Sequence, residues 1–277
     1  MEKKLKRHVA KIVLYLLLII GSIIMVLPFY WMVTTSLKTP SEIVKMPPMW
    51  IPISFKWSNF VEAWHAAPFP RYFLNSVIVT LLSTGGELIT SILAAYAFYR
   101  LEFYGKKIIF SIMMGTMMIP GEMLLMPNFV TLTNLGWMNS YKALIVPWIA
   151  SVFSIFMFTQ YFSTIGDELY YAAKIDGSKD FRYLTNIIVP ISKPMIITIA
   201  IIRSIGSWNS FMWPLIVTNS DEMRTLSVGL TAFITDVGTS YQLLMAASTF
   251  IILPMIILFL AMQKYIIEGV SHAGIKG

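Results

Sequence analysis

Six long apolar segments constrain this 277-residue chain more than any other feature. They cover approximately residues 12–35, 74–98, 108–132, 141–162, 194–217 and 243–263. About 20 apolar residues let one helix cross the hydrocarbon core of a bilayer, where a helix satisfies its own backbone hydrogen bonds. The composition agrees, because 57% of the residues are hydrophobic and 13% are charged. The sequence therefore predicts an all-α membrane protein with six transmembrane helices, folded as a single domain over residues 1–277 in the lipid bilayer.

Positive charges predict the orientation of these helices. Most of the 21 Lys and Arg residues lie in the N-terminal segment, the linker 100–107, the loop 164–193 or the tail 264–277. Basic residues are retained on the cytoplasmic side, so we expect a multi-pass protein of the cytoplasmic (inner) membrane with both termini in the cytoplasm. The net charge of +7 then reflects topology, and no nucleic-acid partner is expected.

Proline residues predict irregular backbone in two regions. The third apolar segment contains Ile119-Pro-Gly-Glu122 and then Pro127, and we expect a kink or break at both places because Pro removes a helical donor. Protein or water must cover such a break at membrane depth, so it indicates either an aqueous path or a packing kink. The outer loop 36–73 is rich in Pro, so we expect a partly ordered cap over the outer mouth without a long helix.

Three ionisable residues fall inside apolar segments: Glu87, Glu122 and Arg203. Such groups are costly in lipid and indicate either pairing or function. We predict a structural ion pair between Glu87 and Arg203. Glu122 follows the break at Pro120 and is the better candidate for lining a solute path.

A polar segment, DELYYAAKIDGSKDFRYLTNIIVPISKP (167–194), separates the fourth and fifth apolar segments. Gly177 allows a turn between two short helices, and we expect Asp176 to cap the second one. Ala172 and Ala173 leave room for the surface of a partner to approach closely. The segment is either a docking element or an amphipathic surface helix between two spans.

No residue pattern indicates catalysis or a resident metal. The chain has no Cys, and its three His residues are far apart in the sequence. A phosphate-binding loop is also missing, because Arg100 stands where the motif ending at Gly105-Lys106 would need its first Gly. We therefore predict a chain that is not an enzyme and that itself binds no cofactor or metal.

Five segments, in the same order along the chain, resemble one family of membrane proteins. They are LPFYWMVTTSLKTPSEI (27–43), RYFLNSVIVT (71–80), IPGEMLLMPNFVTLTNLGWMNSYKALIVP (119–147), WNSFMWPLIVT (208–218) and QKYIIEGVSHAGIKG (263–277). The family is the maltose-type (MalG-like) group of binding-protein-dependent permeases, the inner permease subunits of bacterial carbohydrate ABC importers. The polar segment resembles the family's "EAA" loop, with Tyr171 in place of the usual Glu and Leu184 in place of the usual Phe.

This resemblance implies a type I ABC importer permease fold in which the loop 164–193 inserts into a cytoplasmic ATPase. ATP-Mg would be bound by that ATPase dimer. A second homologous permease and an extracytoplasmic sugar-binding protein would complete the importer. Within the cytoplasmic tail 264–277, Gly274-Ile275-Lys276-Gly277 would reach toward the ATPases, with a disordered terminus as the alternative. The residues expected to couple to the ATPase are Glu168, Tyr171, Ala172, Ala173, Asp176, Gly177, Ile187 and Pro190.

In such an importer, four residues are candidates for the sugar path: Glu122, Trp208, Asn209 and Trp213. Indole rings pack against the C–H faces of sugars, while amides and carboxylates bind hydroxyls. Trp is also common at membrane interfaces for anchoring alone, so both interpretations are kept.

Three other functions are alternatives to carbohydrate import. A glycerol-phosphate ABC permease shares the motifs, but it should have more cationic groups along its path than Arg203. An ion-coupled secondary sugar transporter predicts two halves with matching broken helices, whereas only the third apolar segment is clearly broken in the sequence. A membrane assembly factor would have little use for the EAA-type loop.

Overall fold

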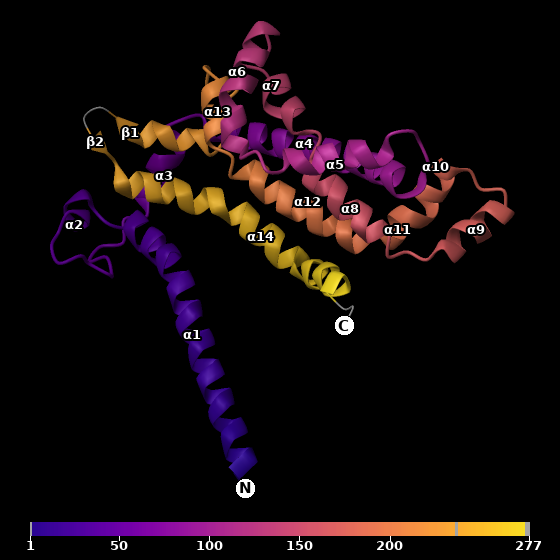
Figure 1. The fold of residues 1–277 in the computed structure, drawn as a ribbon. Helices are drawn as coiled ribbons and strands as arrows, with labels where there is room; N and C mark the ends of the chain where they lie inside the picture. The colour runs from indigo at the N-terminus through magenta and orange to yellow at the C-terminus, as the bar shows by residue number, and fades with distance from the viewer. Residues whose placement is uncertain (1, 236–237, 275–277) are drawn as a thin grey trace. The chain divides into compact units, whose positions relative to one another are not determined.

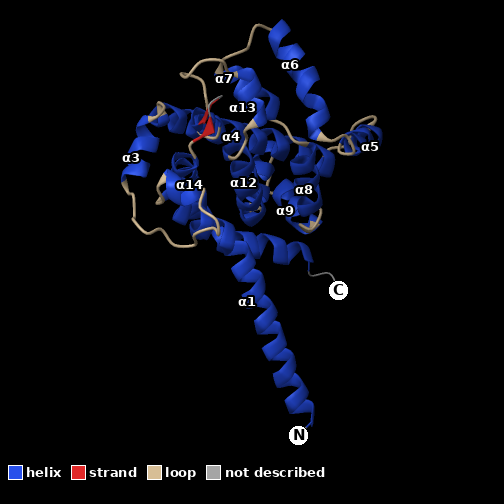
Figure 2. Ribbon diagram, turned by 90° about the vertical axis from the view of Figure 1, so that its left-hand side faces the viewer, coloured by secondary structure: helices blue, strands red, loops and turns tan. Residues whose placement is uncertain are grey.

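The structure, a computed structural model, describes residues 2–235 and 238–274. Helices account for nearly all of the regular structure, and the only strands in these two ranges form one short hairpin (Figure 2). The hairpin pairs β1 (Ile234–Thr235) with β2 (Gly238–Thr239) in antiparallel register. The α-helices are α1 (Glu2–Ser36), α2 (Pro40–Ile43), α3 (Ser58–His65), α4 (Phe69–Arg100), α5 (Lys106–Thr116), α6 (Leu125–Asn134), α7 (Tyr141–Ile145), α8 (Val152–Phe162), α9 (Asp167–Ile175), α10 (Asp180–Tyr183), α11 (Val189–Ile191), α12 (Lys193–Trp208), α13 (Met212–Val217) and α14 (Tyr241–Gly274). Short 3-10 turns cover Gly121–Leu124, Val146–Trp148 and Val228–Phe233, and a π-helical turn covers Leu184–Ile188.

The chain divides into two compact units. The first combines Met1–Phe69 with Leu230–Leu253, and the second combines Pro70–Gly229 with Pro254–Gly277. All residues predicted for the coupling loop and for the sugar path belong to the second unit. A single domain over residues 1–277 stays a prediction, and residues 275–277 of the predicted tail lie outside the described residues.

Four helical segments are long and apolar enough to cross a membrane: Arg7–Ser36, Phe69–Arg100, Tyr141–Phe162 and Tyr241–Lys264. Two further candidates are helix pairs that bend at a break. The bend is 95° between Lys106–Thr116 and Gly121–Asn134, and 77° between Asp180–Ile191 and Lys193–Trp208. The described residues therefore hold four candidate spans, or up to six if each bent pair crosses once. The prediction of an all-α membrane fold is confirmed, and six spans is the upper end of this range.

The second unit is built around three helices that run side by side, α4, α8 and α12 (Figure 1). Helices α9 and α10 lie at one end of this group, and α7 and α13 lie at the other (Figure 1). At the α9 end, Ala95 of α4, Phe158 and Phe162 of α8, and Ile188 are fully buried in one cluster. Apolar side chains on the outer faces, such as Ile89 and Ile112, are exposed as expected for contact with lipid.

The break expected in the third apolar segment is confirmed at Pro120 and is wrong at Pro127. Helix α5 ends at Thr116, whose carbonyl would need the N–H that Pro120 lacks. Pro127, in contrast, lies in the first turn of α6, where no intrahelical donor is required. The α6 helix therefore runs through Pro127.

The fourth apolar segment is also interrupted, although its sequence was predicted to form a continuous span. Pro147 cannot donate to the carbonyl of Ala143, and the 3-10 turn Val146–Trp148 follows α7 at this point. The carbonyl of Ala143 instead accepts a hydrogen bond from Trp213 Nε1 at 3.0 Å. A tertiary contact thus replaces the donor that Pro147 lacks.

The fifth apolar segment likewise ends early. Helix α12 stops at Trp208, and α13 begins only at Met212. In a continuous helix the ring of Pro214 would clash with the carbonyl of Ser210, which explains the break between the two helices. The expectation that only the third segment is broken was therefore wrong.

The outer loop 36–73 contains the short helices α2 and α3 and otherwise irregular backbone, as its Pro content predicts. Its organising residue is Glu42, which is only 7% exposed. The carboxylate accepts hydrogen bonds from the backbone N–H groups of Thr39 at 2.7 Å and Ile53 at 2.8 Å. These bonds, that of Thr39 above all, lower the pKa of Glu42. A role for this loop as a cap over the outer mouth stays a prediction.

Candidate functional site

The predicted coupling loop folds into two short helices, α9 and α10, joined by a tight turn. Gly177 adopts a φ of 75° at the turn, where any other residue type would be strained. Its N–H donates to the carbonyl of Lys174 at 3.0 Å, and the N–H of Ser178 donates to the carbonyl of Ala173 at 2.8 Å. This pair of bonds is a Schellman motif, which closes the C-terminal end of α9.

The predicted role of Asp176 as the cap of the second helix is wrong. Asp176 is the last residue before the turn and forms the C-cap of α9. Helix α10 begins after Lys179, whose side chain makes no capping bond. Two residues of turn after Gly177 separate the Asp176 carboxylate from the first N–H groups of α10, so it is too early in the chain to cap them.

Asp180 ties the loop to the end of α4. Its Oδ1 atom accepts hydrogen bonds from Tyr96 of α4 at 3.3 Å and from Tyr170 of α9 at 3.2 Å. The same oxygen lies 3.0 Å from the ammonium of Lys174, and this contact raises the pKa of Lys174. One carboxylate therefore connects α4, α9 and α10.

Large apolar side chains are exposed on the loop among its charged residues. Four large side chains project from it with exposed fractions between 45% and 86%: Leu169, Tyr171, Ile175 and Phe181. We refer to these four as the α9–α10 ridge. Exposed apolar surface of this kind marks a contact site for another protein or for a membrane. Sequence reasoning named only Tyr171 of the four; the signal it missed was the apolar residues on either side of the Asp176-Gly177 turn.

The remaining predicted coupling residues divide between the surface and the core. Glu168, Ala172, Asp176, Gly177 and Pro190 are exposed. Ala173 is 6% exposed and Ile187 packs beside it in the same core cluster, so these two support the loop from inside. Leu184, at the position where the family usually has Phe, is also buried, so this departure affects packing rather than the exposed surface.

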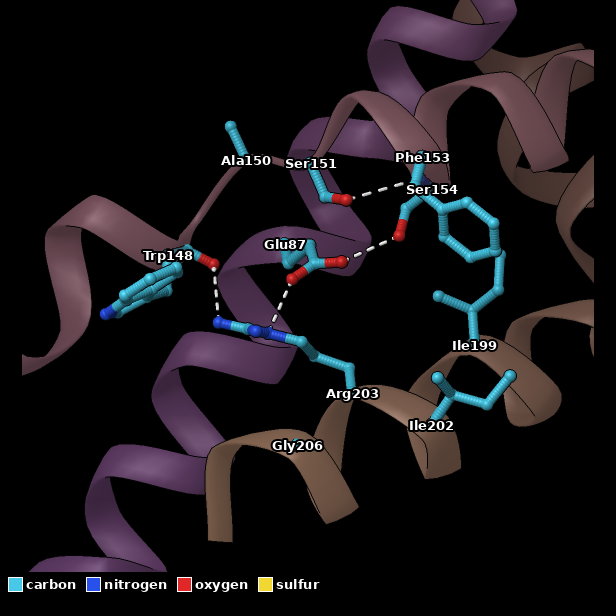
Figure 3. Close-up of a pocket in the computed structure, with 10 residues that line it drawn as sticks. All are labelled: Glu87, Trp148, Ala150, Ser151, Phe153, Ser154, Ile199, Ile202, Arg203 and Gly206. Carbon is cyan, nitrogen blue, oxygen red and sulfur yellow. Dashed lines mark hydrogen bonds and ion pairs between the residues drawn. The ribbon is translucent and has the colours of Figure 1, made fainter. Parts of the chain in front are cut away.

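A cavity of about 400 Å³ lies among α4, α8 and α12, lined in part by the predicted ion pair (Figure 3). The pair is confirmed, since Arg203 Nε lies 2.6 Å from Glu87 Oε2. The Nε–H is not directed at the carboxylate, so the contact is an ion pair without a linear hydrogen bond. Ser154 donates to the other Glu87 oxygen at 2.6 Å. A second cavity of about 190 Å³ shares Trp148, Arg203 and Gly206 with the first.

The four residues proposed for the sugar path are placed differently from one another. Trp208 and Trp213 are each 3% exposed, so neither presents an open indole face. Glu122 and Asn209 are exposed. Of the four, Trp213 alone lines either cavity. Their contact with a sugar stays a prediction, and the half-buried ring of Trp148 is an aromatic cavity residue that sequence reasoning missed.

Comparison with known proteins gives a consistent family. The family described as "Binding-protein-dependent transport system inner membrane component" matches residues 87–272. The arabinooligosaccharides transport system permease protein AraQ of Bacillus subtilis is 33% identical, covering 97% of both chains. The sn-glycerol-3-phosphate transport system permease protein UgpE of Yersinia pestis is 31% identical, covering 92% of this chain and 94% of the relative.

A solved structure supports the fold. A chain of a bacterial ABC transporter involved in the import of the acidic polysaccharide alginate superposes with a TM-score of 0.83 at 22% identity, covering 93% of this chain and 96% of that chain. The family match covers more than half of the sequence. This chain therefore belongs to the family of binding-protein-dependent transport system inner membrane components.

Proposed function

We propose that this chain is one permease subunit of an ATP-driven importer that moves a carbohydrate across the cytoplasmic membrane by alternating access. A second homologous permease, a cytoplasmic ATPase dimer that binds ATP-Mg, and an extracytoplasmic sugar-binding protein complete the proposed importer. In this proposal, both termini of the chain lie in the cytoplasm. The oligosaccharide named for the AraQ relative supports a carbohydrate as the solute.

The observation that carries the coupling role is the α9–α10 ridge. Its apolar side chains are exposed, while the turn beneath them is fixed by Gly177 and by the bonds to Asp180. A rigid element with exposed apolar side chains suits insertion into a cleft of another protein, because little order has to be gained on binding. We infer that the ridge meets the ATPase.

The test is co-purification of the ATPase with a tagged form of this chain. Ile175 is 86% exposed, so Ile175→Asp should leave the fold intact and place a charge in the contact. We expect the ATPase to be lost while the second permease is retained. The matched control is Ile51→Asp, which changes an Ile that is 65% exposed in the outer loop. Retention of the ATPase by Ile175→Asp would contradict the docking role, and its absence from the wild-type complex would contradict the importer itself.

Glycerol phosphate is the second candidate solute, and it is favoured by the identity of 31% to UgpE. An anionic solute calls for an unpaired cation along the path. Arg203, the in-span cation, is already paired with Glu87 at 2.6 Å, so the carbohydrate is preferred. Membership of a binding-protein-dependent family argues against the ion-coupled transporter, although more than one span is broken.

A further inference from the structure

The two partners of the in-span ion pair have different surroundings. The Glu87 side chain is 4% exposed, and its two oxygens are met by Ser154 and Arg203. The Arg203 side chain is 22% exposed and lines both cavities. A guanidinium has five N–H donors. Among the described residues, Arg203 makes one hydrogen bond, from Nη2 to the carbonyl of Trp148 at 3.4 Å.

This asymmetry does not suit a purely structural pair. Unmet donors of a charged group are costly at membrane depth, so a structural pair should be enclosed on both sides. The open side of Arg203 therefore needs water, a polar solute or a polar group of the second permease. The two cavities that meet at Arg203 provide the space for one.

The walls of these cavities combine three kinds of group. The centre of the Trp148 ring lies 5.5 Å from the Arg203 guanidinium, and this ring provides an aromatic face. Hydroxyl groups come from Ser151 in the larger cavity and from Ser207 and Ser210 in the smaller one. An aromatic face with a few convergent polar groups suits a ligand that has both a C–H face and hydroxyl edges.

We propose that the two cavities around Arg203 form a solute subsite of this permease, in which Arg203 donates to hydroxyl groups and Trp148 packs against the ring of a sugar. The proposal deepens the proposed function and rests on it. Glu87 and Arg203 are the only charged residues described in either lining, and their charges cancel. The subsite is therefore selective for a neutral polyhydroxylated solute over an anionic one.

Water access is tested first, and the chain suits this test because it has no Cys. Ala150→Cys places a thiol on an exposed residue of the larger cavity, and Ile89→Cys places one on α4, 64% exposed but outside both linings. The complete transporter in nanodiscs is treated with a charged methanethiosulfonate, and the mass of this subunit is followed. We expect Ala150→Cys to react at least tenfold faster; equal rates would overturn the proposal.

Solute passage is tested by filling the cavity. Gly206 and Gly85 are both helical and both have open space where a Cβ would be added, but only Gly206 lines the cavities. With radiolabelled arabinotriose, we expect Gly206→Leu to lower uptake at least tenfold while ATP hydrolysis continues, and Gly85→Leu to retain uptake. Equal uptake by the two variants overturns the subsite and leaves the importer intact. A wild-type complex without ATP-dependent uptake of arabinotriose or of other oligosaccharides contradicts the proposed function instead.

The role of the charges is tested with a neutral pair. The double variant Glu87→Gln/Arg203→Gln keeps the site uncharged and should assemble, but it removes the guanidinium donors. We expect its KM for arabinotriose to rise at least tenfold, whereas a wild-type KM would show that the pair is structural only. Wild-type uptake of sn-glycerol 3-phosphate should be at least tenfold less efficient than that of arabinotriose, and the reverse order contradicts a neutral solute.

Discussion

Arg100 Nη1, at the C-terminal end of α4, lies 2.6 Å from Asp167 Oδ1 at the first residue of α9. Each charge is placed where the dipole of its own helix favours it, with the cation at a C-terminus and the anion at an N-terminus. The same guanidinium lies 3.4 Å from the centre of the Tyr170 ring. The end of a membrane span is thereby joined directly to the helix that carries the α9–α10 ridge.

We expect Arg100→Gln to weaken the connection between α4 and α9 without preventing assembly of the transporter. Asp167 is 63% exposed, so the ion pair contributes at most about 1 kcal/mol. The contact with the Tyr170 ring adds about 0.5–1 kcal/mol. Movement of α9 should then be passed to α4 less completely, and the solute moved per ATP hydrolysed should fall roughly fivefold on the basis of about 1 kcal/mol.

The measurement is uptake and ATP hydrolysis by the same proteoliposomes. Glu102→Gln serves as the control, because it removes an exposed partner 3.1 Å from Lys106 at the same end of α4. If Arg100→Gln moves as much solute per ATP as Glu102→Gln, the contacts of Arg100 with α9 have no part in coupling ATP hydrolysis to transport.

The turn of the loop gives a second prediction. Gly177→Ala forces a side chain into a left-handed φ of 75° and should destabilise the loop by about 1–2 kcal/mol. Gly166→Ala is the matched control, since Gly166 has a φ of −61° and its added Cβ would meet only the flexible Glu168 side chain at 3.8 Å. Hydrogen exchange across residues 167–183 should rise in Gly177→Ala alone. A rise of equal size in both variants would argue against a requirement for the positive φ.

Asp180 gives a third prediction, because three donors converge on one of its oxygens. Asp180→Ala removes all three contacts and should destabilise the attachment of α9 and α10 to α4 by about 1–3 kcal/mol. Asp176→Ala changes an exposed Asp in the same loop for which the described residues provide no side-chain partner. Limited proteolysis of the purified complex should cleave the loop faster in Asp180→Ala than in Asp176→Ala, and similar rates would contradict an anchoring role for Asp180.

Much of this arrangement can be predicted from the sequence where a residue has few possible partners. Glu87 and Arg203 are two opposite charges inside apolar segments, so pairing is nearly forced. Gly177 likewise marks a turn whatever surrounds it. Arg100, in contrast, is consistent with topology alone, and its contact with Asp167 depends on how two distant segments pack.

The roles of the Trp residues could not be predicted, because they depend on which face of a helix meets a neighbour. Trp208 and Trp213 are candidates for a sugar in the sequence, but both are buried. Trp148, in the 3-10 turn Val146–Trp148 that contains Pro147, lines both cavities, whereas Trp213 lines only the smaller one. A helix break caused by Pro can be predicted from the local sequence. The tertiary contact that replaces the missing backbone donor cannot.

Trp213 gives a fourth prediction, which separates the effect of Pro147 from that of the tertiary hydrogen bond. Trp213→Phe keeps an aromatic side chain, smaller than indole, but removes the donor to the carbonyl of Ala143, which Pro147 also leaves without an N–H. A buried carbonyl without a partner costs about 1–3 kcal/mol. We expect a lower thermal midpoint of the purified complex for Trp213→Phe. Pro147→Ala in the same chain restores a backbone donor and should recover part of the loss; no recovery would contradict this explanation of the break.

Glu42 gives a prediction about pH. Its hydrogen bonds hold its folded pKa below the ordinary value of 4.5, so the carboxylate stabilises the outer loop above that pH. This contribution is lost as the pH falls from about 4.5 through the folded pKa. Glu42→Gln should destabilise the loop by about 1–3 kcal/mol at pH 7 and by less at pH 4.

Hydrogen exchange of residues 36–57, corrected for the intrinsic rate at each pH, measures this effect. Protection in the wild-type protein should fall between pH 7 and pH 4. Most of that fall should be absent in Glu42→Gln, because the Gln side chain does not titrate. Glu62→Gln is the control, since Glu62 is exposed on the neighbouring helix α3. An equal loss of protection at acidic pH in Glu42→Gln and Glu62→Gln would assign the pH dependence to some other group.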